Sequence, residues 1–141
     1  MIPTLLVDTG PLVAALNRRS PYHDWIQKIW ERSRAPAITV ESVLSETAFL
    51  LRRDGLSIDP LFELLTCGAL TVGLRIDEHV QDIRTLLKRY CNRPMSLADA
   101  GLVRLAEIYP NGQVVTFDPD FRIYRKHGNR VIPVIEPSRA L

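Results

Sequence analysis

The sequence has few of the residues that build zinc sites and disulfide frameworks. Its two cysteines, Cys67 and Cys91, are far apart and lack the spacing of zinc ligands. Its three histidines also lack zinc spacing and have no evident serine or cysteine partner. These absences argue against a zinc enzyme or a hydrolase triad and favour a reduced, cytoplasmic protein. A disulfide between the two cysteines is left open.

Long apolar runs and phosphate-binding loops are missing as well. No stretch of about 18 apolar residues occurs, so we predict no membrane-spanning helix, and we expect no signal peptide. A glycine-rich loop ending in Gly-Lys-Ser or Gly-Lys-Thr is absent, which argues against a P-loop nucleotidase. Asp8 has no second aspartate two residues later, which argues against a phosphatase that works through an aspartyl phosphate.

The chain does have enough apolar residues for one well-packed domain. Its 141 residues are 46% hydrophobic and contain no repeat or long linker, so we predict a single domain over residues 1–141. Predicted strands alternate with predicted helices, which indicates a three-layer α/β/α fold with a central parallel sheet. The strands are predicted at Thr4–Val7, Ala37–Ile38, Ala69–Val72, Val114–Phe117 and Val131–Ile135. The helices are predicted after Pro11, at Tyr22–Arg34, Glu41–Arg53, about 59–67, Asp77–Tyr90 and Ser96–Tyr109, with a helical turn at Phe121–Lys126.

Four acidic residues occupy positions where such a fold gathers functional groups. Asp8 and Asp118 directly follow predicted strands, whereas Glu46 and Asp99 lie on predicted helices. Two carboxylates about 4 Å apart would repel by roughly 4 kcal/mol at an effective dielectric of about 20. A cluster of four therefore needs bound cations or shifted protonation. Oxygen ligands favour Mg²⁺ or Mn²⁺, and the matching substrate is a phosphodiester.

Each acid also has a purely structural interpretation. Asp8 has the position of a helix cap, and Asp118 begins a turn-forming Asp-Pro-Asp segment. Asp99 follows Ser96 by three residues, the spacing of a capping box. These interpretations are compatible with a metal site, because a firmly held helix start also positions a ligand.

Most helical glutamates face solvent, but the apolar neighbours Phe49 and Leu50 lead us to expect that Glu46 is partly buried. Thr9 and Thr116 are placed to add hydroxyl contacts to metal-bound water.

Charge and apolar patterning add two weaker indications. If metal neutralised the four acids, 12 of the 16 acidic residues would remain against 18 basic ones, most of them arginine, which suits phosphate contacts. A bias of genome composition would explain the arginines equally well. The candidates for contacting a phosphodiester backbone are Arg18, Arg19, Arg52 and Arg122. The helical stripe of Trp25, Ile26, Ile29 and Trp30 is interpreted as core packing or as an apolar groove for a partner helix.

Four segments together resemble the PIN-domain family over essentially the whole chain. They are Leu-Leu-Val-Asp8-Thr-Gly-Pro, Val-Leu-Ser-Glu46-Thr-Ala-Phe, Met-Ser-Leu-Ala-Asp99-Ala and Val-Val-Thr-Phe-Asp118-Pro-Asp-Phe. Within this family the chain is most similar to the VapC-type toxins of prokaryotic toxin–antitoxin pairs.

The resemblance implies a Mg²⁺- or Mn²⁺-dependent ribonuclease whose four acids are Asp8, Glu46, Asp99 and Asp118. It also implies an RNA substrate, a cognate antitoxin protein that occupies the active-site groove, and a homodimer. Many relatives have an acid where this chain has Ser20, and polar or acidic residues near Asn92, so a fifth acidic ligand is not expected. Two other interpretations stay open: an RNA-processing nuclease without an antitoxin, and a catalytically silent binding module.

Overall fold

The computed structural model describes residues 3–138, so residues 1–2 and 139–141 of the predicted domain lie outside the described residues. The helices are α1 (Thr9–Leu16), α2 (His23–Arg32), α3 (Glu41–Arg53), α4 (Asp59–Thr66), α5 (Val80–Arg89) and α6 (Leu97–Ile108), with 3₁₀ turns η1 (Ile76–Glu78) and η2 (Pro119–Arg122). The strands are β1 (Thr4–Val7), β2 (Ala37–Thr39), β3 (Leu70–Val72), β4 (Gly112–Val115), β5 (Arg125–Lys126), β6 (Arg130–Val131) and β7 (Val134–Ile135).

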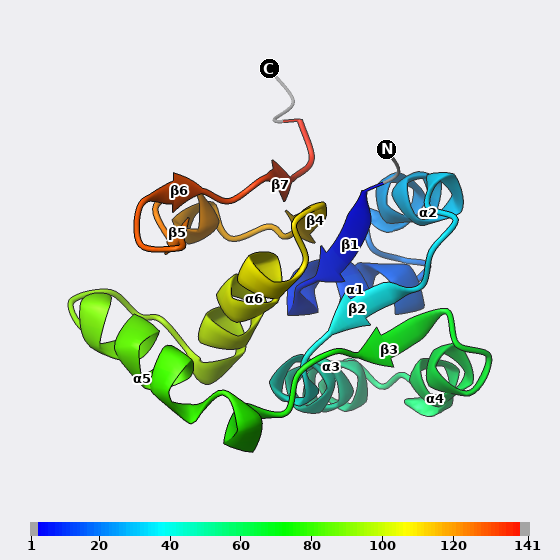
Figure 1. The fold of residues 1–141 in the computed structure, drawn as a ribbon. Coiled ribbons are helices and arrows are strands. Elements are labelled where there is room, and N and C mark those ends of the chain that lie inside the picture. The colour runs from blue at the N-terminus through cyan, green and yellow to red at the C-terminus, as the bar shows by residue number, and fades with distance from the viewer. Residues whose placement is uncertain (1–2, 139–141) are drawn as a thin grey trace.

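The centre of the fold is a parallel sheet of five strands in the order β3-β2-β1-β4-β7. Helices flank it on both faces, which confirms the predicted three-layer α/β/α architecture (Figure 1). The chain builds outward from β1 to β2 and β3, and then returns to the other side of β1 with β4 and β7. The strand order therefore reverses between β1 and β4, where Val7 lies beside Val115. Open parallel sheets bind ligands at such a reversal, outside the carboxyl ends of the strands.

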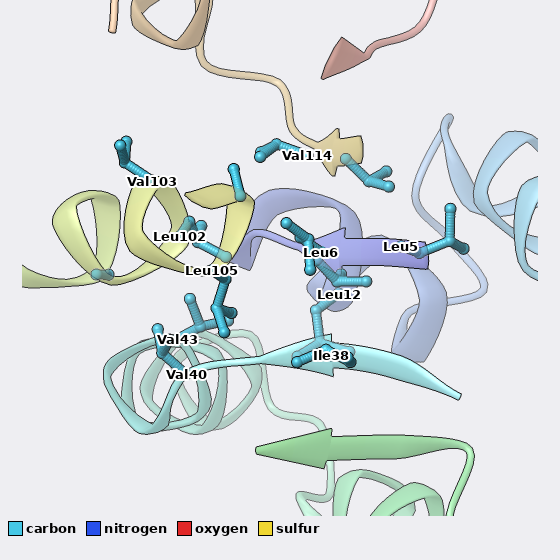
Figure 2. Packing of buried hydrophobic residues seen from close by; sticks show 14 of the residues in the cluster. Leu5, Leu6, Leu12, Ile38, Val40, Val43, Leu102, Val103, Leu105 and Val114 are labelled. Atoms are coloured by element: carbon cyan, nitrogen blue, oxygen red, sulfur yellow. The ribbon is translucent and has the colours of Figure 1, made fainter. Parts of the chain in front are cut away.

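Apolar residues on the central strands explain why the sheet is buried. Leu5, Leu6 and Val7 are all buried, as expected for a strand covered on both faces. Figure 2 shows Leu6 of β1, Ile38 of β2 and Leu105 of α6 in this shared core.

Close packing also positions α6. A Cβ atom added to Gly101 would lie 3.0 Å from Val40 Cγ1, so glycine at this point lets α6 approach the start of α3. The amino-terminal end of α6, which carries Asp99, is thereby held near the edge of the sheet.

Two predicted elements begin or end elsewhere in the structure. The helix predicted from Asp77 starts only at Val80, because Arg75 contacts Asp77 and Glu78 in a tight 3₁₀ turn and His79 leaves helical geometry. The helix predicted at Tyr22–Arg34 is shorter at both ends.

The carboxyl-terminal strands also differ from the prediction. β4 ends at Val115, two residues before the predicted end, and the Thr116 hydroxyl accepts a hydrogen bond from Asp118 N. The last predicted strand is divided at Pro133, which has no N–H to donate. As a result β6 pairs with β5 in an antiparallel hairpin, whereas β7 pairs with β4. The end of the predicted helical turn, Arg125–Lys126, is strand β5.

Cys67 and Cys91 are both free and exposed. Within residues 3–138, no helix has the length and apolar character needed to span a membrane.

Candidate active site at the carboxyl edge of the sheet

Asp8 is fixed at the point where β1 ends and α1 begins. It is the N-cap residue of α1, and its Oδ1 accepts a hydrogen bond from Thr9 N at 2.8 Å. Its Oδ2 accepts a second bond from the Thr116 hydroxyl at 2.7 Å. With 9% of its surface exposed, the carboxylate is buried but fully oriented by neutral donors. The capping interpretation is correct, and it coexists with a position at the strand-order reversal.

Thr116 joins Asp8 to Asp118 across the reversal. The Thr116 hydroxyl donates to Asp8, and its oxygen accepts from Asp118 N at 2.9 Å. Asp118 Oδ1 in turn accepts from Asp120 N at 2.9 Å, which is the turn geometry expected of an Asp-Pro-Asp segment. One hydroxyl thus sets the spacing between the carboxyl ends of β1 and β4.

Asp99 is held by the predicted capping box. Its Oδ2 accepts from Ser96 N at 3.0 Å, and its own N–H donates to the Ser96 hydroxyl at 3.0 Å. The residue is 9% exposed and lies in the first turn of α6. The start of α6 therefore keeps this carboxylate in place without a basic partner.

Glu46 lies on the same side of the fold but is exposed, so the expectation that it is partly buried is wrong. The neighbouring Phe49 is itself 65% exposed, which explains the error: this side of α3 is apolar but not covered. The Thr9 hydroxyl donates to Glu46 Oε2 at 3.0 Å and links α3 to the residue that follows Asp8. In the structure, therefore, Thr9 and Thr116 contact the carboxylates themselves.

The electrostatics show that the acids affect one another. Burial raises the pKa of Asp8 from 3.8 to about 6, even though hydrogen bonds from Thr116 and Thr9 lower it. The negative charges of Asp99 and Asp118 raise it further. Burial also raises the pKa of Asp99, with smaller contributions from the charges of Asp118 and Glu46. The four acids thus form one electrostatically coupled group, and no cation of the described residues is among the causes that shift the pKa of Asp8 or Asp99.

Comparison with known proteins identifies the family. The family model of the PIN domain matches residues 5–126. The chain belongs to the PIN-domain family. No curated protein sequence matches it. Among solved structures, it is similar to Mycobacterium tuberculosis VapC20, described as a sarcin–ricin loop cleaving toxin. The two are 22% identical with a TM-score of 0.72, and the match covers 90% of this chain and 99% of that one.

The donor set of this PIN domain suits a hard divalent cation, since all four side chains are carboxylates. Within residues 3–138, no three Asp, Glu, His or Cys side chains are arranged as a ready metal site. Each of the four carboxylates accepts a hydrogen bond from a protein donor. In the described part of the chain, however, Glu46 Oε1 and Asp118 Oδ2 accept no hydrogen bond. The residues therefore fit a metal by donor chemistry and charge.

Two further residues border the site of the PIN domain. Arg93, which is not among the predicted RNA contacts, lies 3.9 Å from Asp120 Oδ1, whereas the predicted Arg122 is engaged by Glu136. Tyr124 is fully buried, and its hydroxyl has no hydrogen-bond partner within residues 3–138. Burial raises the pKa of this phenol, as do the charges of nearby aspartates, Asp99 first among them. Of these residues, Arg93 had one signal in the sequence: its position just before the capping box that holds Asp99.

Proposed function

We propose that this chain is a divalent-metal-dependent endoribonuclease and the toxin of a VapBC-type toxin–antitoxin pair. The observation that carries the proposal is the coupled carboxylate group at the reversal of strand order, in which Thr116 joins Asp8 to Asp118. An enzyme that hydrolyses a phosphodiester needs negative ligands for a cation and fixed positions for them. Both are present, and the site lies where parallel sheets bind ligands.

In this proposal Asp8, Asp99 and Asp118 hold one or two Mg²⁺ or Mn²⁺ ions, directly or through water. An ion held there would supply a lower pKa for the attacking water and would offset negative charge on the phosphate. Glu46 holds that water or accepts its proton, a role that suits an exposed carboxylate whose Oε1 is free within the described residues. Thr116, Thr9 and the backbone of Ser96 orient the carboxylates, so little reorganisation is needed when substrate arrives.

Two observations support RNA as the substrate. VapC20, to which the chain is similar in fold, is described as cleaving the sarcin–ricin loop, which is RNA. In addition, if the four acids were neutralised, basic residues, most of them arginine, would outnumber the remaining acidic ones. Such an excess of positive charge favours a polyanionic substrate.

The proposal includes an antitoxin partner and a homodimer, as the family resemblance implies. An apolar groove of about 240 Å³ supports the antitoxin; its lining includes Leu16, Trp30 and Leu64. Trp30 is only half-buried, as expected if part of the predicted helical stripe serves a partner, while Ile26 of the same stripe is fully buried. Light scattering of the purified chain, alone and with its antitoxin, tests both partners.

Thermal melting with and without Mg²⁺ or Mn²⁺ tests the metal site. We expect the ions to raise Tm of the parent, because binding to the folded state stabilises it by about 2.7 kcal/mol at a ligand concentration of 100 Kd. Asp99→Asn should lose the rise, and the control Asp77→Asn, outside the site, should keep it. Cleavage of single-stranded RNA by the parent with metal, and its loss in Asp99→Asn, completes the test.

Two outcomes would contradict the proposal. A folded parent that neither gains stability from millimolar metal nor cuts RNA would indicate a silent PIN module. Metal-dependent cleavage by a chain with no antitoxin-like reading frame beside its gene would indicate an RNA-processing nuclease.

A further inference from the structure

Three aromatic rings form a group around Phe117, which directly precedes Asp118 in the chain. The rings of Tyr22 and Phe117 have centroids 4.8 Å apart, and the rings of Trp25 and Phe117 have centroids 5.7 Å apart. Phe117 lies in the chain between Thr116 and Asp118, so its Cα is about 3.8 Å from the Cα of Asp118. We call Tyr22, Trp25 and Phe117 the aromatic platform.

The platform is held rigidly although its outer ring is open to solvent. Ser20 Oγ accepts a hydrogen bond from Tyr22 N at 3.2 Å, and a ring nitrogen of His23 lies 2.8 Å from Ala14 O, which ties the start of α2 to α1. Phe117 packs so closely on the start of α1 that a Cβ added to Gly10 would lie 2.6 Å from its ring. Tyr22 nevertheless remains 42% exposed.

We propose that Tyr22, backed by Phe117, stacks against an unpaired nucleobase of the RNA next to the phosphate that is cut. The inference rests on the proposed ribonuclease function and assigns a residue that recognises its substrate. Bases in a duplex are already stacked, and an aromatic side chain can take only a base that has left the stack. A preoriented ring binds such a base at low entropic cost.

The charges around the platform favour a nucleic acid over an apolar protein segment. Arg18 and Arg19 are exposed in the loop that leads to Tyr22. Among the described residues, neither forms an ion pair. Unpaired arginines in the loop that precedes an exposed ring provide both elements of single-strand recognition: cations for phosphates and a flat surface for bases.

The first experiment measures binding of a single-stranded RNA by fluorescence anisotropy in EDTA, where metal-dependent hydrolysis does not occur. Tyr22→Ala and Tyr22→Leu should weaken binding by about 5- to 150-fold, the range expected for loss of one base–aromatic stack. Tyr22→Phe, which keeps the ring, should recover most of the loss. Phe62→Ala is the matched control, because Phe62 is similarly exposed (54%) but lies on α4. Melting curves verify that each variant is folded, and Tyr22→Leu preserves apolar bulk if Tyr22→Ala does not fold.

The second experiment locates the base. The cut site is mapped with the parent and Mg²⁺ or Mn²⁺, and each nucleotide flanking it is then replaced by an abasic one. One of these replacements should lower kcat/KM of the parent by about the same factor as the Tyr22→Leu substitution does on the intact RNA. The same abasic RNA should cause no further loss of kcat/KM in Tyr22→Leu.

The outcomes separate this inference from the proposed function. A parent that binds RNA through Tyr22 but never cuts it would contradict the nuclease and leave the platform standing. Cleavage of RNA by Tyr22→Leu with the same efficiency as by the parent would overturn the role proposed for the platform, and it would leave the proposed nuclease function unaffected. Loss of antitoxin binding in Tyr22→Leu, with RNA binding unchanged, would also overturn it, because the surface would then be a protein interface.

Discussion

Two aspartates near the same edge of the sheet have opposite environments. Asp8 follows β1, is 9% exposed, and has its pKa raised to about 6 by burial. Asp77 follows β3, is exposed, and has its pKa lowered by a hydrogen bond from Arg75. An arginine compensates the charge of one carboxylate, whereas hydroxyl and amide groups orient the other and leave its charge uncompensated. The difference distinguishes an acid that stabilises a turn from one that is available to a cation.

Replacing the two aspartates in turn should separate these roles most clearly. Asp8→Asn should lower kcat/KM for RNA cleavage at least about 100-fold, as expected when an electrostatic element of an active site is removed. Asp77→Asn should cleave like the parent, because its partner lies outside the site. Initial rates on a mapped RNA fragment measure both. A folded Asp8→Asn protein with parental rates would remove the basis for the site.

The stability of the metal-free protein should depend on pH in a direction set by Asp8. Because its pKa is raised on folding, the folded state binds more protons than the unfolded state between about pH 4 and 6. The stability contributed by this group is therefore greatest below pH 4 and falls as the pH rises to 6. The fall is at most about 3 kcal/mol, from a shift of roughly two pKa units.

The comparison of the parent with Asp8→Asn isolates this effect. The free energy of unfolding of Asp8→Asn relative to the parent should increase between pH 4 and pH 7 in EDTA, measured by urea denaturation. In Asp77→Asn the free energy of unfolding relative to the parent should change in the opposite direction, and mainly below about pH 4, since the pKa of Asp77 is lowered on folding from 3.8. A pH-independent difference between Asp8→Asn and the parent would mean that Asp8 is not desolvated.

Thr116→Val should have an intermediate effect. The valine cannot donate to Asp8 or accept from Asp118 N, which should cost about 1–3 kcal/mol for buried groups left without partners. Losing the Thr116 hydrogen bond should also move the pH-dependent fall in stability to higher pH. Thr39→Val is the control: its buried hydroxyl donates to Val7 O at 2.8 Å, which is a backbone carbonyl and not a carboxylate. Thr39→Val should lose stability without changing how stability depends on pH. A change of that pH dependence in Thr39→Val would contradict the role assigned to Thr116.

Arg75→Gln should have the smallest effect. Arg75 and Asp77 are both exposed, and ion pairs in solvent contribute little to stability. We expect no measurable change in Tm at low or high salt. A fall in Tm as large as that of Thr116→Val would show that the Arg75–Asp77 ion pair is as important for stability as the Thr116 hydrogen bonds between β1 and β4.

The sequence predicts those parts of the site that local spacing determines. Ser96 and Asp99 are three residues apart, and the capping box follows from that spacing alone. The contact between Thr116 and Asp8 spans 108 positions and depends on which strands become neighbours, so only the fold reveals it. The exposure of Glu46 was predicted wrongly because apolar neighbours do not show whether another element covers them. Pro133 did carry a local signal, the missing N–H that ends β6 and separates it from β7.

The bridge between Asp8 and Asp118 also has a consequence for the order of synthesis. The two carboxylates are 110 positions apart, from residue 8 to residue 118, so a nascent polypeptide has no complete site until residue 118 has been added. The ribosome that translates this message would therefore be exposed to an incomplete site while the residues between them are added. In a protein proposed to attack RNA, this topology delays the activity until Asp118 has been synthesised.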